Sequence, residues 1–105
     1  MDRIKDLPDE EWKPIAGYNG KYLVSNMGRI QSLKHRKPKL LTAFVNNKGY
    51  ARICLSKDGA GKHFLVSRLV AAAFCENDDP LHKTTVDHID GNHLNNRADN
   101  LRFMS

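Results

Sequence analysis

The sequence predicts an α+β fold: a small antiparallel β-sheet module, a short linking helix and a further β-hairpin. Three observations favour this class. From Trp12 onward, short stretches of alternating apolar and polar residues are separated by turn signals, which is typical of hairpin-linked strands. Apolar residues then take helical spacing between Leu65 and Ala73. After a loop that contains Pro80, residues 84–88 begin with a β-branched run that indicates another strand.

The strands before the helix are each bounded by turn residues. Pro14 restricts the first strand to a sheet edge, and Asn19-Gly20 is a favoured pair for a tight hairpin turn. A basic loop is expected over residues 35–39, and a glycine-rich turn over residues 58–61 closes the last hairpin. We expect six strands, at residues 12–15, 22–25, 29–33, 40–45, 50–55 and 62–66.

The helix is predicted over residues 66–74, and the final segment, residues 98–103, is expected to be a returning strand or a turn. The strand at residues 84–88 carries Asp87 and His88 side by side. Adjacent side chains of a strand point to opposite faces unless the chain kinks. We divide the chain into a loose acidic lead-in (1–11), a basic β-rich module (12–64), and a unit with the helix and the last motif (65–105).

Length and composition limit the class of protein. A chain of 105 residues with 40% hydrophobic residues is expected to form one small globular domain. No apolar run approaches the length of a membrane span. The first twelve residues lack an apolar signal core, so we expect a cytoplasmic protein with no membrane partner. Cys54 and Cys75 are far apart and are expected to be reduced thiols.

The charges are unevenly distributed along the chain. Between Trp12 and Phe74 there are twelve Lys or Arg residues and one acid, Asp58. Such an excess of positive charge indicates a polyanionic partner and favours nucleic acid. The alternative is a generally basic surface that has no partner. Each basic residue taken singly could be a solvated surface charge. The candidate phosphate contacts are Arg29, Lys34, Arg36, Lys37, Lys39, Arg52 and Lys62.

The run VDHIDGNHLNNRADNLRF, residues 86–103, gathers the groups that carry chemistry. Asp87 offers a carboxylate to a divalent cation, and the accompanying amide oxygens favour Mg²⁺ or Mn²⁺ over zinc. A neutral His88 can take a proton from a water that attacks phosphorus, although a lone histidine is more often structural or exposed. Asn100 can orient the loop or the imidazole by hydrogen bonding. For His93, we expect an exposed side chain.

As a block, DHIDGNHLNNRADNLR resembles the central motif of HNH endonucleases of the phage and intron homing type. Upstream, EEWKPIAGYNGKYLVSNMGRIQSL resembles the small β module that precedes the nuclease in that family, and SRLVAAAF resembles the joining helix. The resemblance runs from about Glu11 to the last residue. It implies a monomeric, metal-dependent enzyme of a bacterial or phage-infected cell that hydrolyses phosphodiester bonds of duplex DNA, leaving nicks.

The resemblance also implies a role for each motif residue. Asp87 corresponds to the acid that binds one Mg²⁺ or Mn²⁺ ion, His88 to the general base, and Asn100 to the asparagine that props the active-site loop. Arg68, on the joining helix, is the candidate for the scissile phosphate, with a salt bridge to a neighbouring acid as the alternative.

In the family that the sequence resembles, the nuclease motif forms a ββα-metal (His-Me finger) unit. Residues 65–105 are expected to include the β-hairpin part of that unit. The family's last metal ligand lies in a helix that we expect beyond Ser105. Two alternatives to an active enzyme follow from this expectation. The chain could be a catalytically impaired DNA-binding fragment, or a further polypeptide segment could complete the site.

Overall fold

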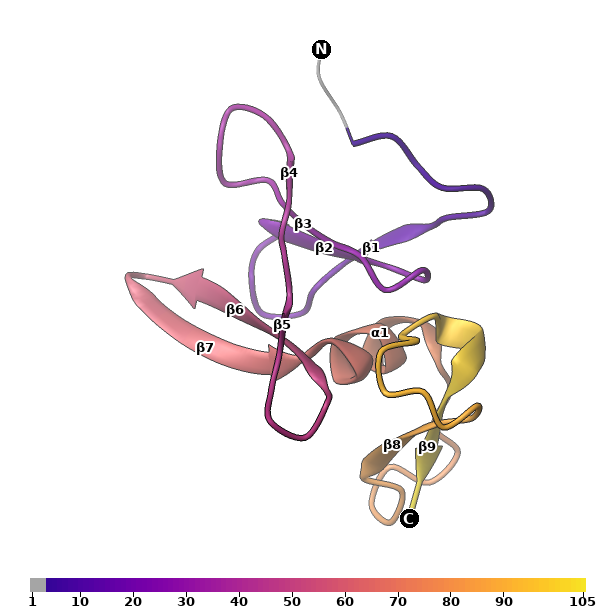
Figure 1. The fold of residues 1–105 in the computed structure, drawn as a ribbon. Coiled ribbons are helices and arrows are strands. Elements are labelled where there is room, and N and C mark those ends of the chain that lie inside the picture. Colours follow the sequence, from indigo (N-terminus) through magenta and orange to yellow (C-terminus); the bar gives the residue numbers. More distant parts are fainter. Residues whose placement is uncertain (1–3) are drawn as a thin grey trace.

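The computed structural model describes residues 4–105, which form three small antiparallel sheets and one α-helix (Figure 1). The first sheet has the strand order β1-β2-β3-β4, the second has the order β5-β6-β7, and β8 pairs with β9. The α+β class is therefore confirmed. The elements are β1 (Trp12–Pro14), β2 (Tyr22–Ser25), β3 (Ile30–Ser32), β4 (Lys39–Leu40), β5 (Phe44–Val45), β6 (Ala51–Lys57), β7 (Ala60–Leu65), α1 (Val66–Phe74), β8 (Thr85–His88), the 3₁₀ turn η1 (Ala98–Asn100) and β9 (Leu101–Met104).

Two tight turns form where the sequence predicts them. In the turn before β2, Asn19 and Gly20 have φ angles of 53° and 77°, and Lys21 N–H donates to Tyr18 O at 2.9 Å. Asp58 and Gly59, with φ angles of 51° and 81°, connect β6 directly to β7. Positive φ at both central residues matches the twist of the flanking strands, which is why Asn-Gly and Asp-Gly are favoured there.

The prediction of one strand over residues 40–45 was wrong. That segment is divided between β4, which pairs with β3, and β5, which pairs with β6 in a different sheet. At the crossing, Leu41 N–H donates to Ile30 O at 2.9 Å, and Leu41 and Ala43 pack against the core. The segment therefore passes from one sheet to the other at residues 41–43, where Leu41 and Ala43 contact the shared core.

The prediction of a loose lead-in was also wrong for its last residues. The Glu10 side chain is fully buried and binds Arg29 through both carboxylate oxygens, with Arg29 Nε 2.8 Å from Oε2. Burial alone would raise the pKa of Glu10, but the bonds from Arg29 and from the Leu7 backbone N–H lower it from 4.5 to about 2. The ion pair thus fastens the lead-in to the first sheet.

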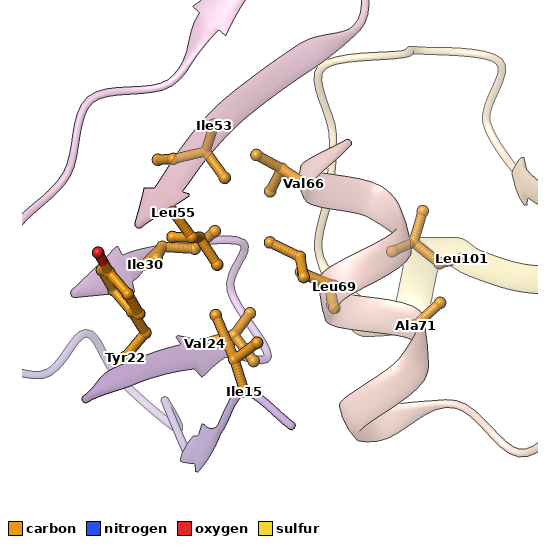
Figure 2. Close-up of a cluster of buried hydrophobic side chains, with 11 residues drawn as sticks. Ile15, Tyr22, Val24, Ile30, Ile53, Leu55, Val66, Leu69, Ala71 and Leu101 are labelled. Atoms are coloured by element: carbon orange, nitrogen blue, oxygen red, sulfur yellow. The ribbon is translucent and has the colours of Figure 1, made fainter. Parts of the chain in front are cut away.

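Helix α1 lies between the first two sheets and the β8–β9 hairpin (Figure 1). It packs against β2, β6 and β7 and also against β8, η1 and β9. Figure 2 shows Val66 and Leu69 of this helix facing Ile53, Leu55 and the first sheet, with Ala71 near Leu101 of β9. One hydrophobic cluster therefore joins all three sheets. Within residues 4–105, no helix has the length and apolarity needed to span a membrane.

Candidate active site

Strand β8 places Asp87 and His88 on opposite faces of the β8–β9 hairpin. Asp87 lies directly across from Arg102, whereas His88 lies across from the buried Leu101. The Asp87 side chain is 43% exposed, while only 6% of His88 is exposed. The strand therefore keeps its regular alternation, and the pair presents one acid to solvent and one imidazole to the interior.

The His88 imidazole is held by Asn96, a residue that the sequence did not single out for this role. Nε2 of His88 lies 2.8 Å from Oδ1 of Asn96, and both residues are buried. With the amide oxygen as acceptor, Nε2 carries the proton and Nδ1 keeps a lone pair. The imidazole is thus arranged to accept a proton at Nδ1. An asparagine eight residues after the histidine gave no periodic signal from which this contact could be predicted.

Aromatic rings surround the imidazole. Tyr50, at the end of the β5–β6 turn, stacks on His93 with ring centroids 4.1 Å apart and planes inclined by 10°. The ring centroid of His88 lies 6.0 Å from that of Tyr50 and 5.5 Å from that of His93. His93 is exposed, as expected, but it is not isolated. Its stack brings the β5–β6 turn of the basic module against the loop that follows β8 (Figure 1).

The loop between β8 and η1 is closed by Asn100, which is buried. Its Oδ1 accepts from the Asp90 backbone N–H at 3.0 Å, and its Nδ2 donates to Asp90 Oδ1 and to Asn95 O, both at 2.9 Å. Asn95, the Asn92 backbone N–H and Asn100 all donate to the Asp90 carboxylate, which lowers the pKa of Asp90. Two roles were expected for Asn100: orienting the loop or orienting the imidazole. Its hydrogen bonds all lie within the loop, whereas the imidazole is bound by Asn96.

The same loop rests on the β2–β3 turn of the first sheet. Ala98 N–H donates to Asn26 O at 2.8 Å. Gly28 has a φ of 85°, and a Cβ at this position would lie 3.1 Å from Asn96 O. A positive φ and so short a distance to Asn96 together require glycine. Gly28 therefore lets the β2–β3 turn pack directly against Asn96, the residue that binds His88.

The Asp87 carboxylate forms an exposed ion pair with Arg102. Nε and Nη2 of Arg102 both lie 3.1 Å from Oδ2 of Asp87. Among residues 4–105, no three His, Cys, Asp or Glu side chains are grouped closely enough to hold a metal ion. The described residues therefore fit a metal ion only in part: Asp87 can supply one hard oxygen ligand, in an exposed pair from which a cation can displace Arg102.

The basic residues proposed for DNA contact have different surroundings. Arg29 is engaged by the buried Glu10, and this ion pair reduces its availability to a phosphate. Arg68, proposed for the scissile phosphate, donates to Thr84 O at 3.0 Å, just before β8, so it keeps its charge close to the motif strand. The others lie on the second sheet or near β4: Lys34, Arg36, Lys37 and Lys39 come after β3, Arg52 is on β6, and Lys62 on β7 lies over the Phe64 ring.

A β-hairpin that carries a buried histidine beside an exposed acid, with its loop closed by an asparagine, defines an HNH-type site. Residues 10–56 match the family described as the NUMOD4 motif, and residues 80–105 match the HNH endonuclease family. The first match covers most of the β module and the second covers the β8–β9 hairpin, so the chain carries both parts of an HNH homing endonuclease. The resemblance seen in the sequence is therefore confirmed.

Individual relatives agree with this assignment. The chain is 47% identical over 95 residues to DNA endonuclease I-HmuI of Bacillus phage SP01, a match that covers 90% of this chain and 52% of I-HmuI. It is 33% identical over 96 residues to the H-N-H endonuclease F-TflII of Escherichia phage T5, covering 91% and 48%. It is 38% identical over 99 residues to an uncharacterised HNH endonuclease, L247, of Acanthamoeba polyphaga mimivirus, covering 91% and 24%.

The fold agrees as well. A solved structure titled as DNA binding and cleavage by the HNH homing endonuclease I-HmuI superposes with a TM-score of 0.81 at 47% identity, over 90% of this chain and 52% of that one. The chain therefore spans about half the length of I-HmuI.

Proposed function

We propose that this chain carries the DNA-binding and catalytic-motif part of a metal-dependent DNA endonuclease that hydrolyses phosphodiester bonds and nicks duplex DNA. The observation that carries the proposal is the buried His88, fixed through Nε2 by Asn96 and left with Nδ1 as a proton acceptor. Support comes from the fold, which is that of an endonuclease whose structure is described as binding and cleaving DNA.

In the proposed reaction, each described residue has a separate task. His88 accepts through Nδ1 the proton of the water that attacks phosphorus. Asn100 keeps the loop after β8 closed, so that Asn96 and His93 stay beside the imidazole. Asp87 would hold a divalent cation, Mg²⁺ or Mn²⁺. When bound, such an ion neutralises charge on the phosphate and on the leaving oxygen. Arg68 contributes a positive charge next to β8.

The proposal is tested by incubating the protein with supercoiled plasmid in the presence of Mg²⁺ or Mn²⁺. We expect open-circular product to appear before linear product, and a chelator to prevent both. The variant His88→Ala should lose cleavage while it still retards duplex DNA in a gel. The matched control is His82→Ala, since the exposed His82 imidazole pairs with Asp79, away from the motif loop. Cleavage by His88→Ala at the parent rate would show that His88 is not the base.

The same experiment separates the alternatives. Salt-dependent duplex binding without cleavage, even at high protein concentration, would select a DNA-binding role for this chain. Cleavage that appears only after a downstream helical peptide is added would select completion of the site by a further segment. Failure to bind duplex DNA at low salt would contradict the whole proposal.

A further inference from the structure

Away from the motif, a cavity of about 200 Å³ opens between the turn before β2 and the turn that joins β6 to β7. Three lysines line it: Lys21, Lys34 and Lys57. In Figure 1 the β6–β7 turn lies on the opposite side of the molecule from β8 and β9. The cavity is therefore separate from the candidate active site. Its remaining lining residues are Tyr18, Asn19, Ser56 and Asp58.

Two of the three lysines are held in place by neutral oxygens. Lys34 Nζ lies 2.6 Å from Ser56 O and 2.7 Å from Ser56 Oγ, and it also lies over the Tyr22 ring. Lys57 Nζ donates to Gly17 O at 2.9 Å. An ammonium group has three donors, so each of these lysines keeps at least one donor for a ligand. Because their partners carry no charge, the positive charges are not neutralised by the contacts that position them.

This arrangement differs from that of other basic residues. Arg29, Lys83 and Arg102 each bind a carboxylate in the structure. In the cavity, a single acid, Asp58, faces three lysines.

Tyr22, which lies behind the lining residues Ser56 and Lys34, also responds to the positive charge. The buried Tyr22 hydroxyl lies 3.2 Å from Ser56 Oγ and accepts from the Ser56 backbone N–H at 3.0 Å. Burial alone would raise the pKa of Tyr22, but hydrogen bonds with Ser56 and the adjacent Lys34 ammonium lower it. Ser56 and Lys34, which line the cavity, thus favour a negative charge nearby, as an anion-binding site requires.

We propose that this cavity binds one backbone phosphate of duplex DNA, an inference that rests on the proposed function. Positioned ammonium groups lose little side-chain freedom when a phosphate oxygen arrives, so they bind it more effectively than freely rotating surface lysines. A duplex that reaches both the cavity and His88 runs along the β module. The longest dimension of the molecule, 41 Å, corresponds to about twelve base pairs of duplex rise.

The test is a comparison of two triple variants that lose the same net charge. In the cavity variant, Lys21, Lys34 and Lys57 are changed to Gln; in the control, Lys5, Lys13 and Lys83, which do not line the cavity, are changed to Gln. Duplex affinity is measured across a range of salt concentrations. We expect the cavity variant to bind about tenfold more weakly at low salt, with a salt slope smaller by about one, and the control to change much less.

Two further arms complete the design. The same three positions changed to Arg keep the charge and should bind duplex like the parent, and thermal unfolding of every variant shows that it is folded. Titration of the parent with inorganic phosphate, followed at the Ser56 and Asp58 amide resonances, tests the source of the anion. Amide shifts with phosphate, together with equal duplex binding by the two Gln variants, would assign the cavity to free phosphate and overturn the DNA proposal.

The remaining outcomes are also distinct. Equal weakening by the two Gln variants, with no amide shifts on addition of phosphate, would mean that the cavity lysines act only as general surface charge. A parent protein that binds no duplex at low salt would contradict the proposed function itself.

Discussion

Two of the arginine–carboxylate pairs in residues 4–105 have very different surroundings. Glu10 is fully buried against Arg29, which is 23% exposed, and the pair fastens the lead-in to the first sheet. Asp87 and Arg102 are 43% and 54% exposed, and their pair lies across the β8–β9 hairpin. A buried pair is costly to break because it leaves a desolvated charge, whereas an exposed pair is weak and exchangeable. The first pair therefore serves stability, and the second leaves its acid available for ligand binding.

The largest expected effect concerns Asp87. We expect Asp87→Asn to reduce plasmid cleavage by about a thousandfold, because the proposed metal ligand is lost. The free energy of unfolding should change by less than about 1 kcal/mol, since the ion pair is exposed. Cleavage assays and urea unfolding check the two quantities. Asp78→Asn, which removes another exposed acid from an ion pair with Lys83, is the control and should alter neither.

At Glu10 we expect a substitution to lower the free energy of unfolding, in contrast to Asp87→Asn. Because its pKa is lowered from 4.5 to about 2, the ionised pair contributes about 3 kcal/mol to the free energy of unfolding. Glu10→Gln should lose that contribution at pH 7 in urea unfolding, with the control Glu11→Gln nearly unchanged. A lowered folded-state pKa stabilises above pH 4.5, and the stabilisation is lost as the pH falls towards 2. The parent and Glu10→Gln should therefore converge over that range; a constant difference would contradict the assignment.

These contrasts also show what could be predicted from the sequence. The turns at Asn19-Gly20 and Asp58-Gly59 and the helix α1 depend on local preferences, and the structure has them where expected. The division of residues 40–45 between two sheets depends on tertiary packing, which no local pattern reveals.

The site follows the same rule. Asp87, His88 and Asn100 stand together in one motif, from which the sequence predicts them as site residues. Asn96 and Tyr50 act through contacts that only folding creates, one in the loop and one from a distant strand end. Glu10 was assigned to a loose segment because its partner Arg29 lies nineteen residues away in the sequence. Burial, which distinguishes the two ion pairs, is likewise a property of the fold.

The buried Asn96 amide controls the charge next to the His88 imidazole. Asn96→Asp would place a carboxylate against Nε2 of His88 and stabilise the charged imidazolium. We expect the acidic limb of the pH profile of plasmid cleavage to move to higher pH, because the imidazole must be neutral to accept a proton.

The matched control for this substitution is Asn92→Asp. It adds the same charge to the same loop and keeps an oxygen acceptor for the Leu94 backbone N–H. An equal shift of the acidic limb in both variants would attribute the effect to general charge instead of the Asn96 contact. Thermal unfolding identifies any variant that no longer folds.

The smallest expected effect is that of Arg102→Ala, which removes the partner of Asp87 and leaves the acid in place. The free energy of unfolding should fall by less than about 1 kcal/mol, as for other exposed pairs. If Asp87 exchanges Arg102 for a metal ion, removing the competing guanidinium should lower the Mg²⁺ concentration for half-maximal cleavage a few-fold. Arg97→Ala, which breaks the exposed pair with Asp99, is the control and should leave that concentration unchanged. A higher Mg²⁺ requirement in Arg102→Ala would mean that Arg102 positions the carboxylate for the metal instead of competing with it.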